Sequence, residues 1–211
     1  TSYSEHMAWF DKFREFNDYF GRLGYILSES RNRVDTLVLH PMKSEYLTFD
    51  RDDDYNSVKD VEVSFEKTIE MLGAENIPHH YGDENIMKRH GKVENGKLIV
   101  GNYAYTYVYI PEMKDMDKNT LRLLTEFTAQ GGKLVIESKK PAYLEGEKYP
   151  FDELKATATL EDIEKSVEYK INGGNGKIRS AYREGDFGTF LYVVNLDEKE
   201  AEVEIKLQSA Y

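Results

Sequence analysis

The chain has 211 residues, a net charge of -11 at pH 7 and no cysteine. This length can hold one large domain, or a medium domain with a further fragment. The negative charge and the lack of a basic block argue against nucleic acid and anionic membranes as partners, and the absence of cysteine excludes disulfides, thiolate metal sites and a cysteine nucleophile.

The first residues, TSYSEHMAWF, show no basic segment followed by an apolar one. No stretch of about 18 apolar residues occurs elsewhere, so the sequence predicts neither a signal peptide nor a membrane span. A piece from the middle of a longer protein would carry no such signal in any case, so the location of the parent protein stays open. The absence of cysteine favours the cytoplasm.

An amphipathic helix is expected near the N-terminus. Large apolar residues recur there at spacings of four and three, which places them on one helix face. Asp18 and Arg22, four residues apart, are expected to form an ion pair, and residues 28–32 to end the helix. We expect the aromatic face to pack on another domain or to form a homo-oligomer interface. The face consists of Trp9, Phe13, Phe16, Phe20, Leu23 and Leu27.

A β-α-β unit is expected next. Residues 36–39 (TLVL) are apolar without alternation, which is typical of a parallel strand covered on both faces. A second amphipathic helix follows, closed by Gly73 at its C-cap, and residues 77–81 form the next strand. The inward face of that helix consists of Val58, Val61, Phe65, Ile69 and Leu72.

The alternation of strands and helices continues through the middle of the chain. Residues 97–100 and 105–110 are expected strands, the latter rich in residues that favour strands. A helix over 119–130, with Leu121, Leu124, Phe127 and Thr128 inward, ends at Gly131-Gly132, and residues 133–137 form the return strand. This order predicts an α/β fold: a three-layer, flavodoxin-like or amidotransferase-like, mostly parallel sheet.

The pattern changes after Asn172. The sequence NGGNG (172–176) is interpreted as a flexible joint, and three alternating segments follow at 177–183, 189–196 and 201–207, with turns between them. The sequence therefore predicts two domains: residues 1–172, the α/β domain with its N-terminal helix, and residues 173–211, antiparallel strands. The second is either a small appended sheet or the start of a truncated β-sandwich.

Four segments, taken in order, resemble one kind of enzyme region. They are the aromatic helix 17–28, DTLVLHP within 35–46, GGKLVIESKKP at 131–141, and FLYVVNL within 182–196. This order is similar to the region that follows the catalytic barrel in large α-L-rhamnosidase-like and β-galactosidase-like glycoside hydrolases. The match covers most of the chain.

The resemblance implies an accessory role. In such enzymes the catalytic carboxylates lie on the barrel, and the amidotransferase-like domain packs beside it. In some members this domain also supports oligomerisation or lends residues to the rim of the site. A barrel needs about 200 residues or more, which this chain uses for other elements. No catalytic residue is therefore assigned, and the fragment alone is not expected to catalyse. The expected partners are the barrel of the parent chain, a second copy and carbohydrate.

Two other functions stay open from the sequence. The chain could be a free-standing carbohydrate-binding or oligomerisation module, or a small self-sufficient hydrolase. For the latter, Glu45 and Glu112 are one conceivable carboxylate pair, but the sequence does not show the separation that such a pair needs. With 39 acidic residues, chance proximity is expected.

Polar residues follow the predicted strands at the edge where an open α/β sheet forms its ligand crevice. One interpretation is a small polar pocket or a surface that meets the neighbouring barrel; the other is that loop ends are ordinarily polar. His40 is expected to hydrogen-bond a neighbour rather than act as a base. The candidate crevice residues are His40, Glu45, Asp83, Glu112, Ser138 and Lys139.

No metal or cofactor is predicted. His79 and His80 are adjacent, so on a strand they point to opposite faces, and their spacing to Asp83 and His90 matches no HExxH or facial-triad pattern. Residues 50–54 lack the glycine and distal glutamate of an EF-hand loop. The first strand leads into HPMKSEYLTF, which has no glycine for a flavin phosphate loop, and no GxSxG elbow occurs.

Overall fold

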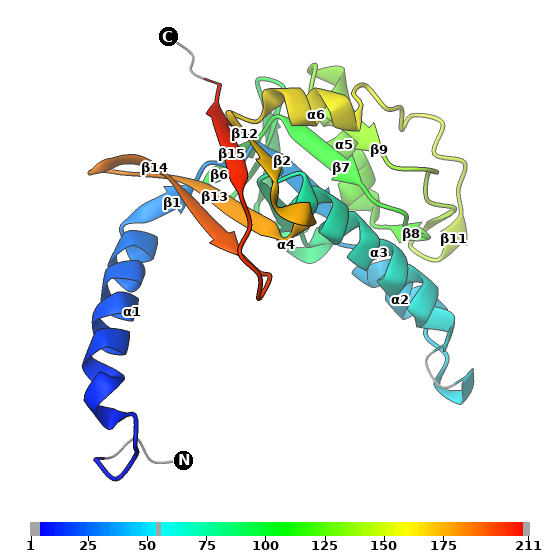
Figure 1. Cartoon of the computed structure of the whole chain (residues 1–211). Coiled ribbons are helices and arrows are strands. Elements are labelled where there is room, and N and C mark those ends of the chain that lie inside the picture. The colour runs from blue at the N-terminus through cyan, green and yellow to red at the C-terminus, as the bar shows by residue number, and fades with distance from the viewer. Residues whose placement is uncertain (1–4, 54–55, 209–211) are drawn as a thin grey trace. The chain divides into compact units, whose positions relative to one another are not determined.

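The structure is a computed structural model that describes residues 5–53 and 56–208. Two compact units share these residues (Figure 1). Unit 1 comprises residues 1–33 and 181–192, and unit 2 comprises residues 34–180 and 193–211. The division expected from the sequence, between residues 172 and 173, stays a prediction.

A four-stranded parallel sheet lies at the centre of unit 2, in the order β3-β2-β7-β9. If these four strands are numbered by their order along the chain, they lie in the sheet in the order second, first, third, fourth, which is the order of flavodoxin-like folds. The predicted α/β fold with a mostly parallel sheet is confirmed. The strands are β2 (Thr36–Leu39), β3 (His79–Gly82), β7 (Tyr107–Ile110) and β9 (Lys133–Ile136).

Helices cover both faces of this sheet because successive side chains on a strand point to opposite sides. On one face, Leu37 and Val108 join a cluster with α5 (Lys118–Ala129) and α4 (Glu84–His90). On the other face, Val38 and Tyr109 join a second cluster with α3 (Asn56–Ala74) and α6 (Leu160–Ser166). The result is three layers with two hydrophobic cores.

The remaining elements of unit 2 are short. An antiparallel sheet precedes β7, a small mixed sheet follows it, and the last strand pairs with β12. No helix of the described residues is long and apolar enough to span a membrane. These elements are α2 (Met42–Thr48), η2 (Arg51–Asp53), β4 (Gly91–Glu94), β5 (Lys97–Val100), β6 (Tyr103–Tyr105), β8 (Asp115–Met116), β10 (Tyr143–Leu144), β11 (Glu147–Lys148), β12 (Tyr169–Gly173), η3 (Gly174–Gly176) and β15 (Val203–Leu207).

Unit 1 joins the N-terminal helix to a strand pair. It contains η1 (Phe10–Lys12), α1 (Phe13–Ser28), β1 (Ser30–Asn32) and parts of β13 (Ile178–Gly185) and β14 (Gly188–Asn195). The Arg183 guanidinium connects them, donating to Leu27 O at 2.8 Å, to Ser30 O at 2.7 Å and to the side chain of Asn32. None of the described residues of unit 1 is buried.

Several expected elements are found. Strand 36–39 agrees with β2, and the helices expected over 17–28, 58–72 and 119–130 lie within or nearly within α1, α3 and α5. In α5, Leu121, Leu124 and Phe127 are buried as expected. The alternating C-terminal segments form β13, β14 and β15, of which β13 and β14 pair with each other and β15 pairs with β12.

Other expectations were wrong in detail. Asp18 lies beside Arg14, 3.9 Å away, rather than pairing with Arg22. The helix does end where expected, at Ser28, and strand β1 follows at once within residues 28–32. Gly73 lies inside α3 and is no C-cap; a Cβ there would come within 2.8 Å of Arg179 Nε, so close packing accounts for this glycine. The first two residues of NGGNG belong to β12, whose pairing with β15 orders them.

The aromatic run 105–110 also differs from the expected single strand. Tyr105 ends β6 in the antiparallel sheet, and Tyr107 begins β7 in the parallel sheet. The change of sheet occurs at Thr106, where the backbone N–H groups of Thr106 and Tyr107 both donate to Asp35 O. Helices α2 and α4 were not predicted. Of the acidic run 50–54, Asp54 lies outside the described residues.

Candidate functional site at the strand ends

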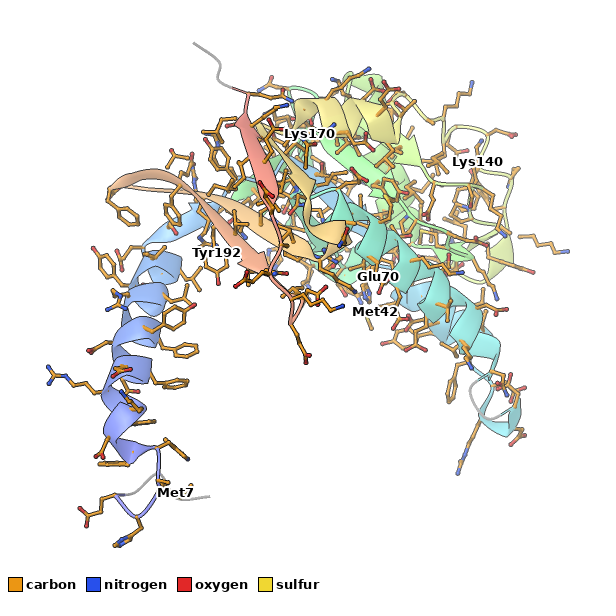
Figure 2. All side chains as sticks on the ribbon, in the orientation of Figure 1. Met7, Met42, Glu70, Lys140, Lys170 and Tyr192 are labelled. Atoms are coloured by element: carbon orange, nitrogen blue, oxygen red, sulfur yellow. The ribbon has the colours of Figure 1, made fainter. Side chains whose placement is uncertain are left out.

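The carboxyl ends of β2, β3, β7 and β9 lie at one edge of the sheet because the strands are parallel. The strand order reverses between β2 and β7, which is where open α/β sheets place their ligands. All six candidate residues lie in the segments that follow these four strands. Figure 2 labels Met42, at the start of α2, and Lys140, beyond β9.

His40 packs between aromatic rings. Its ring meets Phe65 edge-on, with centroids 5.0 Å apart, and Tyr81 at 6.3 Å. Its backbone N–H donates to Gly82 O, which ties the end of β2 to β3, while Nδ1 is buried without a hydrogen-bond partner. The expected hydrogen bond to a neighbour is thus made by the backbone N–H of His40 and not by Nδ1. Aromatic packing holds this ring.

Asp83 and Glu45 belong to short helices. The Asp83 carboxylate accepts the backbone N–H of Ile86 at 2.8 Å and is the N-cap of α4. Glu45 lies half-buried in α2, and its carbonyl accepts the N–H of Phe49 at the helix end. Asp83 thus has a structural use that its position before a helix explains.

Glu112 and Lys139 are the two candidates that contact each other. Lys139 Nζ lies 2.6 Å from Glu112 Oε1, joining the loops after β7 and β9. Both side chains are well exposed, so this ion pair is worth at most about 1 kcal/mol. Ser138, beside Lys139, is exposed.

Glu137 gathers more contacts at this edge than any of the six candidates. Its carboxylate accepts the Thr68 hydroxyl at 3.0 and 3.1 Å and the Glu112 N–H at 3.0 Å. Burial raises the pKa of Tyr109 above its usual value, and the negative charge of Glu137 and a hydrogen bond to it raise that pKa further. Glu137 thereby links α3, β7 and β9.

A second polar cluster surrounds α2. Lys43 Nζ lies 2.6 Å from Asp117 Oδ2, and the side chain of Asp117 is almost fully buried. Burial alone would lower the pKa of Lys43 and raise that of Asp117, but their mutual hydrogen bond and charge outweigh it, so the pKa of Lys43 is raised and that of Asp117 is lowered. Asp117 Oδ1 also caps α5 through the N–H of Asn119.

Ser44 and Glu84 extend this cluster. Ser44 Oγ accepts the N–H groups of Lys114 and Asp115 at 2.8 and 3.0 Å, and Glu84 Oε1 accepts the Asp117 N–H at 2.8 Å. Burial raises the pKa of Glu84 and of Asp115; backbone N–H groups and the charge of Lys43 oppose the rise in both. The cluster ties α2, α4, β8 and α5 together.

The contacts at this edge are structural in kind: they close helix ends and hold loops. Among residues 5–53 and 56–208, no group of three or more histidine and acidic residues is placed to hold a metal ion. His79 and His80 face opposite sides of β3: His79 stacks edge-on with Tyr81, whereas the ring of His80 meets Tyr103 and hydrogen-bonds the Tyr105 hydroxyl. The pKa of each is lowered, first by burial.

Sequence reasoning did not single out Lys43, Ser44, Glu84, Asp117 or Glu137. One signal was available: Asp83 and Asp117 each precede a helix, as N-cap residues do. Nothing in the sequence indicates that Lys43 and Asp117, 74 residues apart, form a pair.

Comparison with known proteins finds a similarity in fold to a solved structure. The chain matches no protein family, and no curated protein matches it. It is similar to the crystal structure of the apo exo-carrageenase GH42 from Bacteroides ovatus, with a TM-score of 0.55 and 13% identity. The match covers 83% of this chain and 24% of that one, so the chain spans about a quarter of the length of the structure it resembles. A fold similar to that of this chain therefore makes up part of that larger chain.

Proposed function

We propose that the chain is a non-catalytic accessory domain of a multidomain glycoside hydrolase, which packs on the catalytic domain and contributes to the rim of its substrate site. The observation that carries this proposal is the structural match, in which a fold of this kind makes up about a quarter of a larger glycoside hydrolase chain. The order of the four segments that resemble such enzymes in the sequence supports the same proposal.

The surface of unit 2 beside the strand ends supports a docking role. Tyr46, Leu47 and Phe49 lie on α2 and just after it, and their exposed fractions are 69%, 41% and 48%. Large apolar side chains clustered on one short exposed element mark surfaces that another protein covers. The polar cluster of Lys43 and Ser44 beneath them fixes α2, so that this surface is presented rigidly.

The contacts of the acidic residues at this edge of the sheet agree with an accessory role. Asp83 is used to cap a helix, Glu112 is bound to Lys139, and Glu137 holds three elements together. A general acid and its partner carboxylate need a cleft that admits a sugar ring between them. The proposal assigns that cleft to the catalytic domain.

Activity assays test the non-catalytic part of the proposal. The purified chain, incubated with aryl-glycosides and with carrageenan oligosaccharides, is expected to give no turnover above a heat-denatured control. Turnover that disappears in Glu112→Gln or Glu45→Gln would instead establish the chain as a self-sufficient hydrolase.

Docking on the catalytic domain is tested with the parent protein divided in two. The separately expressed catalytic domain is expected to bind the chain, and the double variant Tyr46→Ser, Phe49→Ser should weaken binding about tenfold or more. Leu207→Ser, which also removes an exposed apolar side chain from unit 2, is the matched control. Equal loss in both variants, or no binding at all, would contradict the proposal.

The second candidate function is carbohydrate binding, favoured by the exposure of Tyr46, since flat aromatic rings stack on sugars. Calorimetric titration of the chain with neutral oligosaccharides distinguishes the two functions. Saturable binding that is lost in Tyr46→Ser alone would favour a binding module over an accessory domain.

A further inference from the structure

The dipeptide Asn-Gly occurs three times in the chain, at residues 95–96, 172–173 and 175–176. In this dipeptide the asparagine side chain can react with the backbone, because the glycine that follows has no Cβ to shield its nitrogen. All three pairs have this reactivity in the unfolded chain. The contacts in the folded structure decide which of them keeps it.

The reaction is deamidation, and water is its only co-reactant. The glycine nitrogen attacks Cγ of the asparagine: the N–Cγ bond forms, the Cγ–Nδ2 bond breaks, and ammonia leaves with the proton of the glycine N–H. The product is a succinimide ring. Water then opens this ring at either of its carbonyl carbons, which gives aspartate, or isoaspartate with Cβ and Cγ in the main chain. Because the step is intramolecular, its rate depends on whether the backbone can reach the attack geometry.

Asn95 and Gly96 are held in a hairpin turn. They form the two-residue connection between β4 and β5, with φ angles of 54° and 72°, and such a turn needs positive φ at both residues. The Gly96 N–H donates to Gln130 Oε1 at 3.3 Å, and a Cβ on Gly96 would lie 2.7 Å from Gln130 O. Attack on Asn95 Cγ therefore requires this turn to open and to leave the end of α5.

Asn172 is held by a neighbouring strand. It lies in β12 opposite Glu204 of β15, and its Nδ2 donates to Glu204 Oε2 at 3.2 Å. A Cβ on Gly173 would lie 2.6 Å from Glu202 O, so the backbone that would have to rotate is closely packed as well. Ring closure at Asn172 therefore requires the loss of this hydrogen bond and of the local strand pairing.

Asn175 has neither restraint. It is exposed, it lies in η3 between β12 and β13, and among residues 5–53 and 56–208 its side chain has no hydrogen-bond partner. Its backbone is left-handed, with φ 49° and ψ 34°, a conformation that is unfavourable for an L-residue. Rotation of Asn175 towards the attack geometry therefore relieves strain and breaks no hydrogen bond of its side chain.

From these observations we propose that Asn175 is a site of spontaneous covalent modification in the folded protein, where deamidation converts it to aspartate or isoaspartate, while the fold protects Asn95 and Asn172. The modification needs no enzyme. The proposal rests on the contacts of the three asparagines and does not depend on the accessory role proposed above.

Isoaspartate at position 175 changes the backbone beside α3. Arg179 Nη1 donates to Gly176 O at 2.6 Å, and a Cβ on Gly73 of α3 would lie 2.8 Å from Arg179 Nε, so Arg179 connects η3 with the end of this helix. An additional main-chain carbon at residue 175 moves Gly176 O away from the guanidinium. The modification thus weakens this connection and also adds a negative charge.

Incubation of the chain at mildly alkaline pH, followed by mass spectrometry of its proteolytic peptides, tests the proposal. In the urea-unfolded chain the three asparagines should deamidate at similar rates. In the folded chain Asn175 should keep most of its unfolded rate, whereas Asn95 and Asn172 should be slowed about tenfold or more, because local opening must first break their contacts.

Two variants provide a matched control, since glycine adopts the left-handed conformation of both positions without strain. Asn175→Gly should abolish the fast deamidation of the folded chain, and Asn95→Gly should leave it unchanged. Equal rates at the three sites of the folded chain, or faster deamidation at Asn95 or Asn172 than at Asn175, would overturn the proposal.

Urea unfolding tests the effect on the backbone. The incubated chain, enriched in isoaspartate at position 175, should have a lower urea midpoint than freshly purified Asn175→Asp, which carries the same charge without the additional main-chain carbon. Equal midpoints would overturn the inferred loss of the Arg179 connection. None of these measurements involves a catalytic domain or a carbohydrate, so their outcome is independent of the tests of the accessory role.

Discussion

The two units of the chain differ in how they use apolar residues. Unit 2 encloses two hydrophobic clusters, one on each face of its parallel sheet, whereas none of the described residues of unit 1 is buried. Yet α1 has as regular an apolar stripe as α5. A stripe of this kind thus indicates that a helix face will be covered, but only the topology decides whether the same chain covers it.

The largest expected difference between the units is the cost of removing an aromatic side chain. Phe127, in α5, is fully buried in unit 2, so Phe127→Ala should lower the free energy of unfolding by about 3–5 kcal/mol. Phe20 in α1 is half exposed, so Phe20→Ala should lower the free energy of unfolding by less than about 1 kcal/mol. Urea unfolding measures both. Equal costs would mean that α1 is buried after all.

Ion pairs sharpen the same comparison. Asp117 is almost fully buried, holds Lys43 and caps α5, so Asp117→Ala should cost about 2–4 kcal/mol. Glu184 pairs with Arg31 in unit 1, where the arginine is largely exposed, and Glu184→Ala should cost at most about 1 kcal/mol. Thermal unfolding of the two variants gives the values. A larger loss of stability in Glu184→Ala than in Asp117→Ala would mean that the ion pair of unit 1 contributes more than that of unit 2.

Glycine substitutions should change stability with opposite signs in the two units. A Cβ on Gly132 would come within 2.3 Å of the Phe127 ring, so Gly132→Ala should destabilise unit 2 by about 1–3 kcal/mol. A Cβ on Gly21 of α1 meets no atom within 4 Å, so Gly21→Ala should stabilise the helix by up to about 1 kcal/mol. Urea midpoints and helical ellipticity report the two effects. Loss of stability in Gly21→Ala would reveal a close neighbour of α1.

The smallest expected effect is a pH dependence in unit 2. Burial raises the pKa of Glu84, so its proton is held more tightly in the folded state and stability is lost as the pH rises from the ordinary value of 4.5 towards the raised one. Asp117 has the opposite sign, because its lowered pKa gives stability that is lost only as the pH falls through that value. The free energy of unfolding of Glu84→Gln, relative to that of the unmodified chain, should therefore be higher at pH 7 than at pH 4. Urea unfolding at both pH values measures this difference. If the difference in stability between the two chains is the same at both pH values, burial of Glu84 does not raise its pKa.

The sequence predicts the fold class because the strongest local patterns coincide with the real elements. The apolar run 36–39 forms β2, and the periodic segments give α1, α3 and α5. Helices α2 and α4 escape such reasoning because each has seven residues, too few for two turns of apolar repeat. The run 105–110 consists throughout of residues that favour strands, Thr106 included, so nothing in it marks Thr106 as the residue where the chain changes sheets.

The candidate site was predictable in place but not in detail. Parallel strands fix the edge where polar loop residues gather, and all six candidates lie there. Which of them meet depends on contacts across loops, such as Lys139 with Glu112, that have no local signature. The residues with the most partners, Glu137 and Asp117, differ from other acidic residues in the sequence only through the distant groups that fold onto them.

The bonds of Arg183 also have a consequence for biosynthesis. The guanidinium joins residues on α1 and β1 that precede it by 151 to 156 positions. At about 5–20 residues per second, a ribosome needs roughly 8–30 s to travel that far. For much of this time the nascent aromatic helix lacks its arginine anchor. The helix of unit 1 is therefore synthesised long before the arginine that anchors it, which makes the interval before Arg183 emerges a period when a chaperone is useful to this chain.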